Sequence, residues 1–71
     1  MTREQLNALV GLSVGDAADL VRAAGKQPRV YHEHDVIISI SLPEDVVQLL
    51  LNDVNIVTSA ETQASIDAKY Q

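Results

Sequence analysis

Two histidines and two acids stand together in the stretch His32-Glu33-His34-Asp35. On an extended chain His32 and His34 point to the same side, a spacing that can bind zinc, with Asp35 as a third ligand. The same residue types are ordinary in a solvated turn between two strands, and no second cluster of ligands occurs in the sequence. The turn is therefore the favoured interpretation. His32 and His34 remain weak metal candidates, and we expect no cofactor.

The sequence offers little for catalysis. It holds no cysteine, no glycine-rich phosphate loop and no Gly-x-Ser-x-Gly turn, which are the common settings for a nucleophile or a bound phosphate. The neighbouring acids Glu44 and Asp45 suit the start of a helix or a turn better than a paired general acid and base. We expect that the protein is not an enzyme.

The composition indicates one small acidic domain. Five Lys and Arg against ten Asp and Glu in 71 residues give a net charge of −5, which repels a phosphate backbone and counts against nucleic acid as a partner. Phe and Trp are absent, so Val, Ile, Leu and Ala must form a thin core. No apolar run approaches the ~20 residues that span a membrane, and we expect no membrane partner. The first ten residues lack a signal-peptide pattern, which predicts a cytoplasmic protein if the chain is complete and otherwise leaves the localisation unknown.

The clearest local pattern predicts a helix over residues 14–24. Ser13 can cap this helix, and Asp16, three residues on, stands where the acid of a capping box would. Gly25 is placed to adopt the left-handed conformation that ends a helix. The apolar face of the helix comprises Val14, Ala17, Val21 and Ala24, with Leu20 beside it.

The chain after this helix is extended. Residues 29–33 alternate as a short strand, and residues 34–42 are rich in β-branched side chains. Residues 43–51 fit either a strand or a helix, the latter with Ser41 as its cap and Pro43 in its first turn.

A turn and one more strand complete the expected domain. Asn52 and Asp53 predict a turn before a strand at 55–59. The last residues are polar, with alanines spaced by four, which fits a frayed helix or a mobile tail. We therefore expect a single domain over residues 1–60, followed by a C-terminal tail or frayed helix over 61–71.

The order of these elements, with "LVGLSVGDAADLVRAAG" followed by "PRVYHEHD", resembles the potato inhibitor I family of serine-protease inhibitors and its bacterial relatives. The resemblance covers residues 9–60. It implies a Val-Gly-x-Ser turn, a helix, a strand, a protease-binding loop, and a second strand parallel to the first. Asp45, the alternating "VVQLLL", the Asn52-Asp53 turn and the final "NIVTSA" match the later part of the family pattern.

The resemblance also implies a binding loop at residues 36–42. Ser39 stands where the family often has Thr, Ile40 lies on the scissile side, and Ser41 follows it. An extended loop held in the shape that a protease binds loses little entropy on association. Branched side chains favour such a backbone because they restrict its conformations. The partner-binding loop is therefore predicted to comprise Ile38, Ser39, Ile40, Ser41 and Leu42.

The sequence departs from the family in the residues that brace this loop. Members without disulfides support the loop with arginines on and just before the following strand. The corresponding positions here are Leu42, Pro43, Val46 and Gln48. No guanidinium is present there to bond loop carbonyls, so the scaffold is predicted more firmly than inhibition.

Two other interpretations use the same region. A strand followed by a Leu-Pro-Glu helix start at residues 42–44 is similar to ribbon-helix-helix DNA-binding proteins, although neither face of the strand carries Lys or Arg. In addition, ten of the sixteen residues at 36–51 are Val, Ile or Leu. That number fits either a strand buried on both sides or an apolar segment that meets a partner, including a second copy of the chain.

Together these observations predict an α+β domain with a single helix packed on a small mixed sheet, like the potato inhibitor I scaffold. We expect a protein-binding domain whose leading function is serine-protease inhibition through residues 36–42. The alternative is a non-inhibitory interaction or assembly module on the same scaffold, and a DNA binder is the weakest option. The expected partner is a protein, a serine protease or a second copy in a homodimer.

Overall fold

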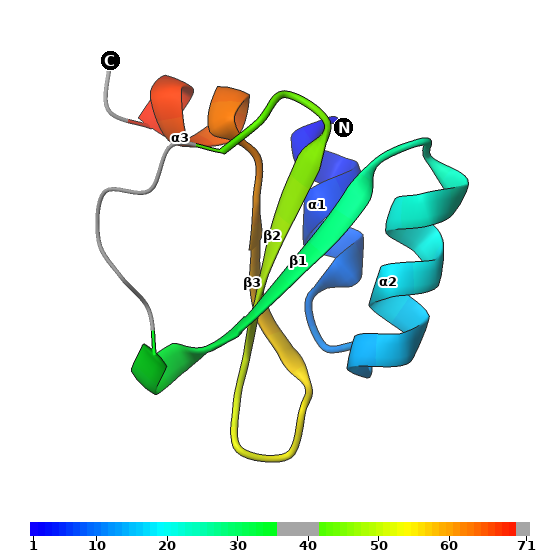
Figure 1. Cartoon of the computed structure of the whole chain (residues 1–71), viewed down its shortest axis with the longest axis vertical. Helices are drawn as coiled ribbons and strands as arrows, with labels where there is room; N and C mark the ends of the chain where they lie inside the picture. The colour runs from blue at the N-terminus through cyan, green and yellow to red at the C-terminus, as the bar shows by residue number, and fades with distance from the viewer. Residues whose placement is uncertain (36–41, 70–71) are drawn as a thin grey trace.

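The computed structural model describes residues 1–35 and 42–69, which fold into three helices and a three-stranded sheet (Figure 1). The helices are α1 (Arg3–Leu9), α2 (Val14–Ala23) and α3 (Gln63–Lys69), with a 3₁₀ turn, η1, at Glu33–Asp35. The strands are β1 (Gln27–His32), β2 (Val46–Leu51) and β3 (Val57–Glu61).

The sheet is mixed, with strand order β1-β2-β3. β1 is parallel to β2, with Gln27 opposite Val46 and His32 opposite Leu51. β2 is antiparallel to β3, with a register shift between Leu50 and Leu51. A small α+β domain with a mixed sheet is therefore confirmed, but the expectation of a single helix was wrong because α1 and α3 are also present.

The predicted helix over 14–24 is confirmed as α2, one residue shorter at its end. The Ser13 hydroxyl accepts a hydrogen bond from the Asp16 N–H at 3.4 Å, which satisfies one of the free donors at the start of the helix. Gly25 ends the helix with a φ of +78°, a conformation that an L-residue with a side chain adopts only at a cost. Ala17, Ala18 and Val21 are buried.

The first helix, α1, is held by a capping box that the sequence analysis missed. The Thr2 hydroxyl accepts from the Gln5 N–H at 3.2 Å, while the Gln5 side chain accepts from the Thr2 N–H at 2.8 Å. Leu6 and Leu9, three residues apart, lie on one face and are buried. The spacing Thr2-x-x-Gln5 before two leucines was the signal for this helix.

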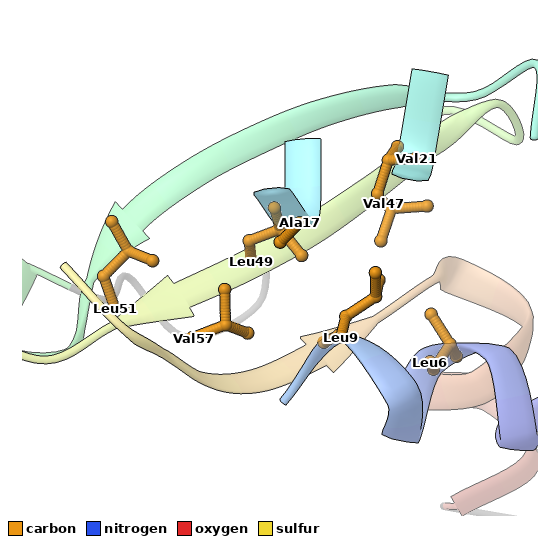
Figure 2. Close-up of a cluster of buried hydrophobic side chains, with 9 residues drawn as sticks. Leu6, Leu9, Ala17, Val21, Val47, Leu49, Leu51 and Val57 are labelled. Carbon is orange, nitrogen blue, oxygen red and sulfur yellow. The ribbon is translucent and has the colours of Figure 1, made fainter. Parts of the chain in front are cut away.

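Residues 46–51 form the central strand, so the helical alternative for this segment was wrong. Val47, Leu49 and Leu51 alternate onto the face that α1 and α2 cover. Figure 2 shows these side chains meeting those of the two helices and of β3. Val46, on the other face, is also buried, and Gln48 and Leu50 on that face are half-buried, so β2 is largely covered on both faces. The core cluster comprises Leu6, Leu9, Ala17, Val21, Val47, Leu49, Leu51, Val57 and Ala60.

The turn between β2 and β3 is closed by Asn52. Its Oδ1 atom accepts hydrogen bonds from the N–H groups of Val54 and Ile56, both at 3.0 Å. Asn55 has a φ of +62°, in the left-handed region that asparagine tolerates. The predicted turn at Asn52 and Asp53 is thus confirmed, and it extends to Asn55.

The link between α1 and α2 pairs with the start of β3. The Gly11 N–H donates to the Val57 carbonyl at 2.8 Å, and the Val57 N–H donates to the Leu12 carbonyl at 2.9 Å. Ser13 adds an antiparallel bridge to Ile56. The backbone N–H and C=O of Val57, at the start of β3, are therefore paired on this side of the sheet.

Candidate functional site

The connection between β1 and β2, residues 33–45, is the candidate site. Parallel strands require a crossover connection, because the chain must return from the end of β1 to the start of β2. The register places these two ends at opposite ends of the strand pair, about 17 Å apart at ~3.3 Å per residue. The described parts of the connection hold the η1 turn at 33–35 and a turn at 42–45, and neither part contains an α-helix.

Four of the five predicted loop residues, Ile38, Ser39, Ile40 and Ser41, lie outside the described residues. The fifth, Leu42, is buried with 6% of its surface exposed. Its buried side chain therefore anchors this end of the connection to the body of the protein. Its backbone N–H donates to Gln63 Oε1 in α3 at 2.9 Å.

Gln63 is held in place by its own helix. Its Nε2 atom donates to Asp67 Oδ1 at 2.9 Å, an i,i+4 bond along α3 that orients the amide so that Oε1 faces Leu42. The helix itself begins with reciprocal bonds between Thr62 and Ser65, each of which accepts from the other's backbone N–H. The segment expected as a tail or frayed helix thus contains a capped helix that contacts the connection.

The sequence alone did not predict that Gln63 accepts a hydrogen bond from Leu42. The bond joins residues 21 positions apart, and no local pattern around Gln63 indicates a long-range partner. Only the arrangement of β2, β3 and α3 brings the two residues together.

The positions that bear arginine in the resembling family provide apolar support here. Leu42 and Val46 are buried, Gln48 is half-buried and Pro43 is exposed. The Val46 N–H donates to the Pro43 carbonyl at 3.1 Å, which closes the turn before β2. Burial of aliphatic side chains and a turn thus fix this end of the connection, in place of charged hydrogen bonds.

The other end of the connection is fixed beside the β2–β3 turn. Glu33 Oε1 accepts a hydrogen bond from the Thr58 hydroxyl of β3 at 2.7 Å. His32 Nε2 lies 3.0 Å from Asn55 Oδ1, so the ring donates from this nitrogen to the amide oxygen. Side chains at the end of β1 are therefore tied to β3 and to the turn before it.

The two histidines lie close together without a third ligand in the described chain. The ring centroids of His32 and His34 are 5.7 Å apart. Among the side chains that the structure describes, which do not include that of the predicted third ligand Asp35, no group of three or more His, Cys, Asp and Glu is arranged to hold a metal ion. The hydrogen bond from His32 to Asn55 gives that ring a structural role in the turn.

A recess of about 260 Å³ lies between α1 and α3. Its polar lining is limited to Arg3 and Ser65, which both contact Glu61: the Arg3 guanidinium at 3.2 Å and the Ser65 hydroxyl at 2.5 Å. These bonds connect both helices to Glu61 of β3, so the polar groups of this recess have a structural role. The lining comprises Met1, Arg3, Leu6, Ala64, Ser65 and Ala68.

Comparisons with known proteins identify no relative. No family model matches the chain. No curated protein and no solved structure is significantly similar to it. Among the described helices, none is long and apolar enough to cross a membrane.

Proposed function

We propose that this chain is a protein-binding domain that inhibits a serine protease through residues 36–42. One observation carries the proposal: both described ends of the β1–β2 connection are tied to other elements. Glu33 is bonded to Thr58 of β3, and Leu42 is bonded to Gln63 of α3. Fixed ends reduce the conformational entropy that a connection loses when it binds, which favours a tight complex.

The parallel pairing of β1 and β2 supports the same proposal. A parallel pair is usually joined by a helix that packs on the sheet. Here α2 precedes β1 and is not the link between the two strands. Residues 33–45 link the end of β1 to the start of β2. The potato inhibitor I resemblance implies this arrangement, in which the segment between two parallel strands contacts the protease.

A panel of chymotrypsin-, elastase- and subtilisin-like proteases tests the proposal. We expect slow-dissociating inhibition of at least one member, and we expect Ile40→Pro to abolish it. Val54→Gly is the matched control, because Val54 is 72% exposed at the tip of the β2–β3 turn, away from the connection. Inhibition that survives Ile40→Pro, or the absence of inhibition across the panel, would contradict the proposal.

One observation favours a non-inhibitory binding domain as the second candidate. The bracing positions hold no guanidinium, and in the described residues on that side of the connection the contacts are those of Leu42 and of the turn that follows. A protease would then cut the connection as a substrate. Mass spectrometry after short digestion separates the two candidates: rapid cleavage between residues 36 and 42 without lasting inhibition supports the second.

A further inference from the structure

In the described chain the outer edge of β1 is an open edge of the sheet. β3 lies at the other edge, where residues 11–14 already pair with it. In the described chain β1 pairs with β2 alone. Figure 1 shows β1 as the outermost strand, with α2 beside it. An open strand edge is a template for another extended chain.

One hydrogen bond shows which backbone groups of β1 face the outer edge. The Gln27 N–H donates to the Asp45 carbonyl at 2.8 Å, so the backbone polar groups of Gln27 face β2. Because these groups alternate along a strand, those of Pro28, Val30 and His32 face outward. Pro28 has no N–H to offer. An edge strand tolerates proline at such a position, where the N–H of another residue would face outward. Val30 N–H and C=O, the Pro28 carbonyl and the His32 N–H remain for a partner strand.

β1 and the residues just before it carry positive charge in an otherwise acidic protein. Three of the five Lys and Arg residues, Arg22, Lys26 and Arg29, lie within residues 22–32, and this stretch contains no acid. Arg22 forms an exposed pair with Asp19 at 3.5 Å. Neither Lys26 nor Arg29 forms an ion pair with a residue that the structure describes. The positive charges of Lys26 and Arg29 are thus available to an anionic partner.

We propose that the outer edge of β1 binds an extended acidic segment of another protein as an additional strand. The backbone of that segment pairs with Val30 and its neighbours, and an acidic side chain lies opposite Arg29. An apolar side chain on the other face of the segment packs on Val30, which is 40% exposed. A second copy of this chain would bring two basic strands together, and like charges on paired strands are unfavourable.

The probe is a fluorescein-labelled ten-residue peptide of alternating valine and glutamate, whose binding is followed by fluorescence anisotropy at low salt. We expect saturable binding that weakens as salt is raised, and amide shifts in NMR spectra centred on Val30 and His32. We expect Arg29→Glu, at an exposed position, to weaken binding about 10-fold. Val30→Pro removes an outward N–H and should abolish binding, whereas Val30→Thr keeps that N–H and should bind.

Three outcomes would overturn the proposal. A peptide with lysine in place of glutamate that binds equally well would show that charge plays no part. Amide shifts that avoid β1 in the wild-type protein would place the peptide elsewhere, whether or not the proline variant folds. Sedimentation showing a dimer that Val30→Pro dissociates would make the second copy the occupant of this edge. None of these measurements depends on protease inhibition.

Discussion

The hydrogen bond from the Leu42 N–H to Gln63 Oε1 should determine how firmly the β1–β2 connection is held. Gln63→Met keeps the length of the side chain and its preference for a helix but removes the acceptor. The Leu42 N–H lies in a part-buried position and would lose its 2.9 Å partner. A hydrogen bond of this kind contributes about 1 kcal/mol. In a 71-residue domain that loss should lower the melting temperature by roughly 4–8 °C.

Hydrogen exchange measured by NMR provides a local assay of the same bond. If the connection opens about 1 kcal/mol more easily, the Leu42 amide should exchange about 5-fold faster in Gln63→Met. The exchange rates of amides in the centre of β2 should change only as far as the global stability changes. The double variant Gln63→Glu/Asp67→Asn is the matched control, because it conserves net charge and keeps an acceptor at residue 63 and a donor at residue 67.

The result that would refute this reasoning is specific. If Leu42 exchanges at the wild-type rate in Gln63→Met, the connection is held by burial of the Leu42 side chain alone. If the double variant is as destabilised as the single one, the loss does not come from the missing acceptor. Either result would also remove one of the two ties on which the proposed inhibition depends.

Three further predictions concern the scaffold. Leu49→Ala should reduce the free energy of unfolding by 2–5 kcal/mol, about the range for a large buried side chain, because Leu49 is fully buried in the central strand; urea unfolding measures this change. Gly25→Ala should cost about 1 kcal/mol, since alanine must adopt a φ of +78°, and an unchanged urea midpoint would contradict that origin. Asn52→Ala removes the acceptor of two N–H groups and should cost about 1–3 kcal/mol, whereas Asn52→Asp, which keeps the oxygen, should cost less in the same assay.

Elements with local signals could be predicted from the sequence. Ser13, Gly25 and the apolar spacing between them define α2 within one turn of the helix. The turn at Asn52 also has a local signal, because the Asn52 side chain alone accepts both of the hydrogen bonds that close it. The capping box of α1 was equally local, but its helix has only seven residues and no long periodic pattern, and it was overlooked.

Features that depend on distant pairing could not be predicted. Residues 46–51 carried signals for both a strand and a helix, and the choice is made by β1, which supplies hydrogen bonds on one side, and by β3, which supplies them on the other. The contact between Leu42 and Gln63 exists only after that sheet has formed. The resemblance at the level of element order anticipated the parallel pairing of the two strands that flank the proposed loop, but not the helix that contacts its end.

The pairing of residues 11–14 at the start of β3 makes the two edges of the sheet different. This link already bonds both backbone groups of Val57, so an incoming strand cannot pair there, whereas in the described chain β1 pairs with β2 alone. Sheets with two free flanks can stack end to end without limit, as fibrils do. If a strand adds at β1 as proposed, the bonds already made by Val57 would hinder growth of the sheet from the β3 side.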